Sequence, residues 1–166
     1  YFCQNAAILK KKTVIFVLSN VIMAKISKEK RSKIMASIHS KNTKPEIIVR
    51  HYLWKNGFRY RLNYNRLPGH PDIVLRKYRT CIFVNGCFWH GHNCPNFRPP
   101  KTNKEFWETK IQHNRERDKE EQRQLRDMGW HVITIWECQL KKDVIEHTWK
   151  SLAFPLNHIF LTDKPI

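Results

Sequence analysis

Cysteine and histidine, two common zinc ligands, are concentrated in one short segment of the sequence. Cys87, His90, His92 and Cys94 fall within eight residues, and Cys138 follows far downstream. Three thiolates and one imidazole make a closed tetrahedral shell, as structural zinc sites use. We therefore expect Cys87, His92, Cys94 and Cys138 to hold a structural Zn²⁺, which leaves His90 outside the shell. The alternative is a set of buried cysteines beside a chance histidine.

The remaining histidine and two aspartates could carry out hydrolysis. Asp72 begins an apolar segment, where its carboxylate suits Mg²⁺, a cation that needs few protein oxygens. An imidazole titrates near neutral pH, so His90 suits a general base. Asp118 is the inward-facing acid best placed to orient it. Each has a structural alternative: a turn for Asp72, zinc support or phosphate binding for His90, and contacts with Arg115 or Gln122 for Asp118.

Hydrophobic patterns predict the elements that position these residues. Residues 43–57 are predicted to form a helix, with Thr43 as N-cap and Gly57 as the stop. Glu46 falls in the first turn of this helix, where a carboxylate suits the helix dipole. That interaction alone would be a purely structural reason for an acidic residue at this position. The residues expected to fall partly on one face are Ile47, Ile48, His51, Tyr52 and Leu53.

Four strands and a long helix follow. We predict strands at residues 58–64, 72–75, 80–84 and 130–136, with the second and third forming a hairpin. A helix is predicted over residues 104–128, closed by Gly129. Spacings of three and four place these residues on its inward face: Trp107, Ile111, Asn114, Asp118, Gln122 and Leu125. The order of elements indicates a single α/β (α+β) domain around a mixed sheet flanked by helices.

Charge suggests the kind of partner. The chain has 31 Lys and Arg against 14 Asp and Glu, a formal net charge of +17. This excess favours nucleic acid over a membrane surface, and the alternative is a solvated, highly charged face. No apolar run is long enough to predict a transmembrane helix. Cysteine spacing fits metal binding in a reducing cytosol better than a disulfide scaffold.

Residues from about 30 to 141 resemble the very-short-patch-repair (Vsr) mismatch endonuclease family, a branch of the restriction-endonuclease-like nucleases. The resemblance implies that family's mixed central sheet with a structural zinc site. The segments that carry it are 67–72, 86–90 with His92 and Cys94, 105–107, 117–118, 129–130 and 136–138.

The resemblance also implies an activity. Family members are Mg²⁺-dependent DNA endonucleases that nick 5′ to the thymine of a T·G mismatch. That mismatch arises when 5-methylcytosine deaminates, and the nick initiates very short patch repair. By resemblance, Asp72 binds Mg²⁺ together with the backbone carbonyl of Val84, and His90 activates water with Asp118 as its partner. Glu46 resembles the acidic residue that supports the site.

The same resemblance implies residues that contact DNA. Phe88, Trp89 and Trp107 resemble aromatics inserted beside the mismatch. A basic arm that embraces the duplex would include Lys30, Arg31 and Lys33. Asn85 stands near the phosphate where the best-known pattern has His, and Val84 stands where it has Thr. The zinc ligands implied are again Cys87, His92, Cys94 and Cys138.

We expect a monomer in the bacterial cytoplasm that associates with the nucleoid and does not bind a membrane. Mismatch-repair proteins are possible further partners. The expected divisions are an upstream or non-native extension (1–22), a basic arm (23–42), the endonuclease domain (43–145) and a tail (146–166). Two alternatives remain: a non-catalytic, zinc-stabilised DNA-binding module, and a related nuclease without mismatch preference.

Overall fold

The computed structural model describes residues 27, 29–30, 33 and 41–162, with side chains described as far as residue 158. Contacts divide the chain into residues 1–40 and residues 41–166. The expected extension (1–22) and Arg31 lie outside the described residues, whereas Lys30 and Lys33 are exposed. No helix in the described part of the chain is both long and apolar enough to cross a membrane.

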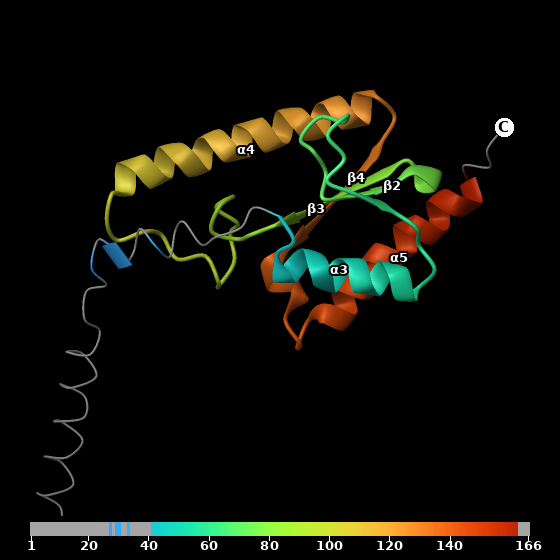
Figure 1. The fold of residues 1–166 in the computed structure, drawn as a ribbon, viewed down its shortest axis with the longest axis horizontal. Helices are drawn as coiled ribbons and strands as arrows, with labels where there is room; N and C mark the ends of the chain where they lie inside the picture. Colours follow the sequence, from blue (N-terminus) through green and yellow to red (C-terminus); the bar gives the residue numbers. More distant parts are fainter. Residues whose placement is uncertain (1–26, 28, 31–32, 34–40, 163–166) are drawn as a thin grey trace, which may run out of the picture. The chain divides into compact units, whose positions relative to one another are not determined.

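A four-stranded mixed sheet forms the centre of residues 41–166 (Figure 1). In sheet order its strands are β1 (Arg61–Leu62), β2 (Ile73–Leu75), β3 (Thr80–Asn85) and β4 (His131–Trp136). Strand β2 pairs antiparallel with both β1 and β3, whereas β3 pairs with β4 in parallel. The predicted hairpin and mixed sheet are confirmed. The predicted strand 58–64 is reduced to the two residues of β1.

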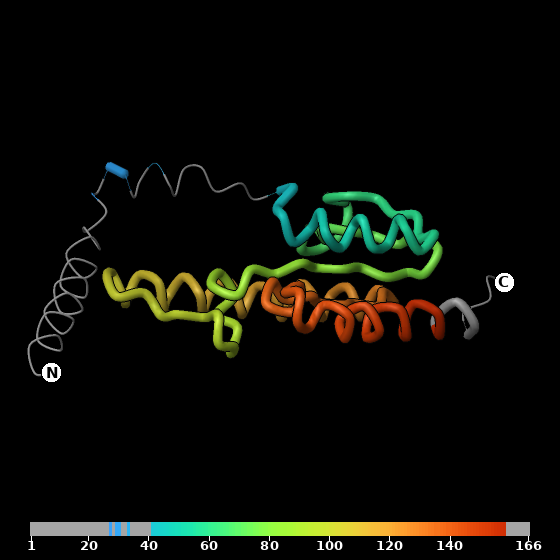
Figure 2. Tube along the Cα trace, turned by 90° about the horizontal axis from the view of Figure 1, so that it is seen from below, coloured from blue at the N-terminus to red at the C-terminus, as the bar shows by residue number. Residues whose placement is uncertain are grey.

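Helices cover the two faces of the sheet. Helices α3 (Lys44–Lys55) and α5 (Ile145–Thr162) lie on one face, and α4 (Lys104–Asp127) lies on the other (Figures 1 and 2). The ring of Tyr52 in α3 stacks on Trp149 in α5 with centroids 4.0 Å apart. Because side chains alternate along a strand, β2, β3 and β4 each supply apolar residues to both layers.

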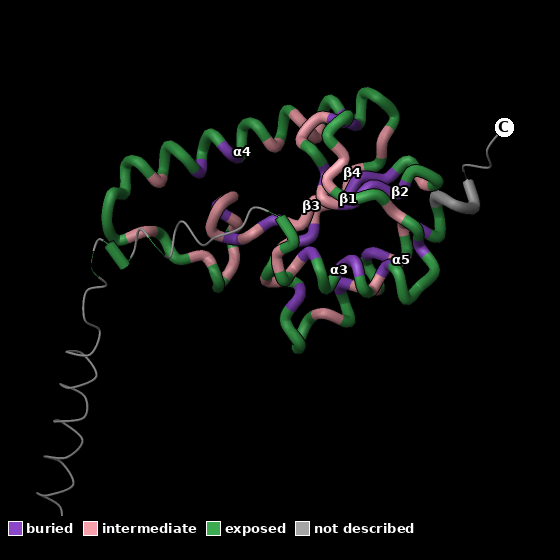
Figure 3. Tube along the Cα trace, viewed as in Figure 1, coloured by how far each residue is buried: buried purple, intermediate pink, exposed green. Residues whose placement is uncertain are grey.

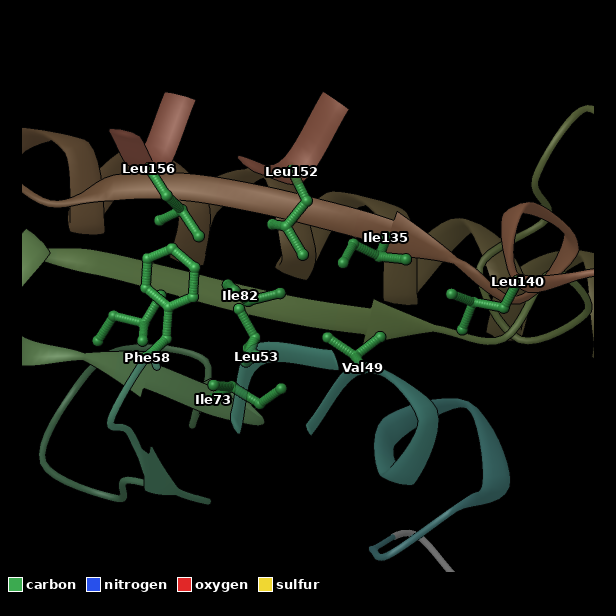
Figure 4. Packing of buried hydrophobic residues seen from close by; sticks show 10 residues of the cluster. Val49, Leu53, Phe58, Ile73, Ile82, Ile135, Leu140, Leu152 and Leu156 are labelled. Atoms are coloured by element: carbon green, nitrogen blue, oxygen red, sulfur yellow. The ribbon is translucent and has the colours of Figure 1, made fainter. Parts of the chain in front are cut away.

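The larger core lies between the sheet and the pair α3 and α5 (Figure 4). Leu53, Ile82 and Leu156 are fully buried there. On the opposite face, Leu125 of α4 packs with Val74 and other side chains in a second cluster. Buried positions therefore follow the strands and the inner sides of the helices (Figure 3).

The sequence predicts a final helix and a tail at the C-terminal end of the chain, with the tail at 146–166. The described part of this segment lies in α5, and Leu152 and Leu156 belong to the main core. Apolar residues at this spacing fall on one side of a helix, which explains why the segment packs against the sheet.

Helix α3 begins as predicted, with a capping box. The hydroxyl of Thr43 donates to Oε1 of Glu46 at 2.7 Å, and the Thr43 backbone N–H donates to the same oxygen at 3.3 Å. This arrangement satisfies donors that a helix start leaves unpaired. The predicted face was partly wrong, because Ile47 and Ile48 are exposed. The buried residues are Glu46, Val49, Arg50 and Leu53.

Helix α4 matches its predicted face closely. Ile111, Asn114 and Leu125 are buried, and Trp107, Asp118 and Gln122 are partly buried. Nearly all other residues of the helix are exposed. Spacing alone therefore located the side of α4 that meets the sheet and the loop after β3.

Candidate active site

Four cysteine and histidine side chains meet where the parallel strands β3 and β4 end. The ligand atoms of Cys87, His92, Cys94 and Cys138 all lie within 4.8 Å of one another, and we call these residues the metal cluster. Nδ1 of His92 lies 3.7 Å from Sγ of Cys87 and 3.5 Å from Sγ of Cys138. Tetrahedral zinc, with bonds of about 2.3 Å to sulfur and 2.0 Å to nitrogen, would place such atoms about 3.5 Å apart. The cluster could therefore hold a metal ion.

The loop that follows β3 and carries three members of the metal cluster is tightly folded. The backbone N–H of His92 donates to the carbonyl of Cys87 at 2.9 Å, and Gly91 has a positive φ of 57°. The imidazole of His92 stacks on Trp136 with centroids 4.1 Å apart. Burial raises the pKa of the Cys87 thiol, so a bound cation would be needed to favour its thiolate.

His90 lies outside the metal cluster and contacts Asp118 of α4. Its Nδ1–H donates to Oδ2 of Asp118. Burial acts to raise the pKa of the Asp118 carboxyl, but the hydrogen bonds and charges of His90 and Arg117 outweigh it and lower that pKa. An ionised carboxylate only accepts, so Nδ1 carries the proton and the lone pair of a neutral ring is on Nε2. No hydrogen bond to Nε2 is found among the described residues.

Asp72 lies just before β2 and is joined to β3. Its Oδ2 accepts the backbone N–H of Val84 at 2.8 Å. Burial, and to a smaller degree the charge of Glu46, raise the pKa of Asp72 to about 6, against the lowering effects of Val84, Arg50 and His90. The pKa of Asp72 thus responds to the charges of Glu46, Arg50 and His90. A desolvated carboxylate of this kind fits a divalent cation, which would stabilise its ionised form.

Glu46 is fixed by several donors at the start of α3. Its side chain is only 3% exposed, and Oε2 accepts from Nη2 of Arg50 at 2.5 Å. Nη1 of Arg50 donates to Oδ1 of Asn42 at 2.6 Å. Glu46 therefore caps α3 and also raises the pKa of Asp72 through its charge. We call Asp72, His90, Asp118 and Glu46 the acid–histidine cluster, because His90 bonds Asp118 and the charges of His90 and Glu46 act on the pKa of Asp72.

The sequence analysis missed Arg50. The signal that could have found it is the spacing of four residues from Glu46, which brings opposite charges together on a helix. Its burial was not predictable from that spacing, because most such pairs are solvent-exposed.

Three predicted aromatic residues, two in the loop after β3 and one in α4, form one group. Phe88 lies 5.3 Å from Trp89 and 5.1 Å from Trp107 between ring centroids, and the two tryptophans lie 5.9 Å apart. Phe106, part of the segment 105–107 but not predicted to contact DNA, contacts Trp107 at 5.3 Å between ring centroids and is 60% exposed. Asn85 is buried at the end of β3, where it pairs with Trp136.

Comparison with known proteins identifies the family. The family described as DNA mismatch endonuclease Vsr matches residues 23–96. The DNA mismatch endonuclease Vsr of Escherichia coli strain K12 is 42% identical over 114 residues, which cover 69% of this chain and 73% of that protein. The chain belongs to the Vsr family. This confirms the predicted family and makes the protein a DNA endonuclease.

Other members of the Vsr family are named nicking enzymes. Type II nicking enzyme V.NmeAIP of Neisseria meningitidis serogroup A is 52% identical over 116 residues, covering 70% of this chain and 83% of that protein. Type II nicking enzyme V.XorIIP of Xanthomonas oryzae pv. oryzae is 44% identical over 116 residues, covering 70% and 85%. The Vsr match includes Glu46, Asp72 and His90, whereas Asp118 and Cys138 follow its end at residue 96.

Proposed function

We propose that this Vsr-family endonuclease nicks duplex DNA on the 5′ side of the thymine in a T·G mismatch, and so initiates very short patch repair. The observation that carries the proposal is the His90–Asp118 pair beside Asp72. Similarity to the mismatch endonuclease of Escherichia coli supports the mismatch as substrate. We expect a monomer acting on DNA in the bacterial cytoplasm.

His90 acts as the general base. Asp118 holds the proton on Nδ1, so that Nε2 can accept a proton from the attacking water. The carboxylate also stabilises the imidazolium that forms when the proton is transferred. The side chains of His90 and Asp118 are 19% and 18% exposed, which leaves the pair accessible to substrate while limiting its hydration.

Asp72 and the backbone carbonyl of Val84 hold Mg²⁺ in this proposal, and Glu46 supports the site. When bound, Mg²⁺ supplies positive charge that stabilises the charge developing on the attacked phosphate. The backbone N–H of Val84 fixes one carboxylate oxygen of Asp72, which orients the other. The positive charge of Arg50 offsets the negative charge of Glu46 and lowers the pKa of Asp72.

The aromatic group and the positive charge hold the substrate. Phe88, Trp89 and Trp107 are proposed to insert beside the mismatch, since apolar wedges unstack neighbouring base pairs. A T·G pair is weaker than a matched pair and therefore yields more readily. Lys30, together with Arg31 and Lys33, contacts the phosphates, and Asn85 lies near the cut. The metal cluster holds Zn²⁺ and fixes the loop that carries His90.

A nicking assay tests the proposal. T·G and matched C·G duplexes, each labelled on both strands, are incubated with the protein, with and without Mg²⁺. We expect a single nick 5′ to the thymine, in T·G duplex only and with Mg²⁺ only. His90→Ala and Asp72→Ala should lower the rate by at least about 10³-fold. Arg123→Ala, on the exposed side of α4, is the matched control for a folded surface variant.

The assay also separates the competing functions. Equal cleavage of T·G and C·G duplexes would identify a nuclease without mismatch preference, as the nicking-enzyme relatives make worth testing. Tight binding to T·G duplex with no nick under any divalent cation would contradict the proposed chemistry. Native-rate nicking by His90→Ala would show that another group is the base.

A further inference from the structure

Side chains of α4 bind three consecutive backbone carbonyls of the loop that carries His90. Nδ2 of Asn114 donates to the carbonyl of Trp89 at 2.9 Å. Nε of Arg115 donates to the carbonyl of His90 at 3.0 Å, and its Nη2 donates to the carbonyl of Gly91. One guanidinium therefore bridges two neighbouring peptide groups, which fixes the orientation of the backbone between them.

The loop approaches the helix too closely for a side chain at the contact. A Cβ placed on Gly91 would lie 2.6 Å from Cγ2 of Ile111 and 2.8 Å from Nη2 of Arg115. Gly91 also has a φ of +57°, which a glycine adopts without strain. Both features favour glycine here and let Arg115 reach the carbonyls from the neighbouring turn of the helix.

His90 is thereby held at two points by one helix. Its ring contacts Asp118, and its carbonyl contacts Arg115 one turn earlier in α4. The ring contact alone would leave the imidazole able to follow movements of its own backbone. Holding the backbone as well defines the direction in which Nε2 points.

We infer that Arg115 is a positioning residue for catalysis. It sets the backbone of His90 and Gly91, next to the Trp89 carbonyl that Asn114 holds, so that the base and the aromatic wedge keep a fixed relation. This inference rests on the roles proposed for His90 and Trp89. A misplacement of about 1 Å in a catalytic group lowers the rate by about 10²-fold. Arg115 therefore affects the chemical step more than the binding of DNA.

The test compares Arg115→Ala and Arg115→Lys with Arg123→Ala, which removes the same charge from a site where Arg123 contacts only exposed acids on its own helix. The value of kcat and KM for nicking T·G duplex is measured with Mg²⁺ at several salt concentrations. Arg115→Ala should lower kcat by about 10²-fold, with KM equal to that of Arg123→Ala. Arg115→Lys should recover part of kcat, because an ammonium group can bond one of the two carbonyls.

Two outcomes would overturn the inference. The first is a kcat of Arg115→Ala equal to that of Arg123→Ala. The second is a raised KM with an unchanged kcat in Arg115→Ala. If the salt dependence of KM is then also weaker than in Arg123→Ala, by about one phosphate contact, Arg115 is a DNA ligand. If Arg115→Ala does not fold, Arg115→Lys alone decides, with an expected loss of about 10-fold in kcat.

A measurement without substrate separates this inference from the proposed function. The hydrogen-bonded Nδ1–H of His90 gives a downfield proton resonance, which His90→Ala assigns by its loss. This resonance should disappear or shift in Arg115→Ala and persist in Arg123→Ala. If the wild-type protein fails to nick T·G duplex but the resonance responds to Arg115→Ala, the proposed function is wrong and the positioning role holds. If the wild-type protein nicks and the resonance does not respond, the positioning role is wrong.

Discussion

His90 and His92 are two residues apart, yet they belong to regions of opposite character. His92 stacks on Trp136 and lies among three thiols, with its Nδ1 between two of them. His90 meets the same tryptophan edge-on at 6.2 Å and turns its Nδ1 to Asp118. In the proposed function, the four donor atoms of the metal cluster all bind one ion. The acid–histidine cluster leaves Nε2 of His90 available. A tight loop with a glycine at position 91 is enough to separate the proposed structural site from the proposed catalytic one.

The two clusters should also affect folding in opposite directions. Metal ligation contributes folding free energy, because the ligands are brought together only in the folded chain. The acid–histidine cluster instead holds Asp72 where its ionised form is poorly solvated. The variants below separate these contributions, from the largest expected effect to the smallest.

Loss of a ligand from the metal cluster should have the largest effect. We expect Cys138→Ser, or removal of zinc from the wild-type protein with a strong chelator, to abolish cooperative unfolding by circular dichroism. Structural zinc binding is worth about 10 kcal/mol or more, which exceeds the net stability of a typical domain. Cys81→Ser is the control, because Cys81 is buried outside the metal cluster. This substitution should destabilise the fold without changing the zinc content. Unchanged melting of metal-free protein would show that the cluster does not stabilise the fold.

Asp118→Asn should affect the rate but not the fold. An amide can keep contact with His90 but does not favour the proton on Nδ1, so we expect kcat to fall by about 10²-fold. Zinc content and melting temperature should remain near those of the wild type, as measured by metal analysis and calorimetry. A rate within a factor of two of the wild type would remove Asp118 from the proposed mechanism.

Asp72→Asn should stabilise the protein while it removes activity. The pKa of Asp72 is raised to about 6 in the folded chain, so the ionised carboxylate lowers the free energy of unfolding above that pH. The effect is absent below about pH 4, where both states are protonated, and it grows as pH rises from about 4 to about 6. At pH 7.5 without Mg²⁺ we expect Asp72→Asn to gain about 2 kcal/mol and to melt a few degrees higher.

Two comparisons check this assignment. The difference in melting temperature between the wild type and Asp72→Asn should shrink as the pH is lowered from 6 towards 4. Added Mg²⁺ should raise the melting temperature of the wild type alone, because only that protein has the proposed ligand. An equal response of both proteins to Mg²⁺ would place the cation elsewhere.

The sequence allowed much of this arrangement to be predicted where local periodicity carries the information. The face of α4 followed from spacings of three and four, which placed Asp118 and Asn114 inward. The four members of the metal cluster followed from the chemistry of their side chains, even though Cys138 is distant in sequence. Such features can be predicted from the type of each residue and from the periodic spacing of residues along the chain.

Other features depend on contacts that no local pattern encodes. Arg50 and Glu46 are buried as a pair, whereas hydrophobicity alone favoured Ile47 and Ile48. Arg115 appeared in the sequence only as a surface partner for Asp118, yet it binds the loop backbone, because the close approach at Gly91 brings carbonyls within its reach. The short β1 likewise reflects an edge position that its own residues do not specify.

Because β3 and β4 are parallel, the loop after Asn85 and the segment that carries Cys138 leave the sheet at the same end. Stacked on Trp136, packed against Ile111 and held by α4, this loop has little freedom to adapt to the shape of what it meets. In the proposed function, recognition therefore depends on how easily the DNA duplex deforms. A duplex that opens easily at one step can fit the rigid loop, whereas a stiffer duplex is not cut.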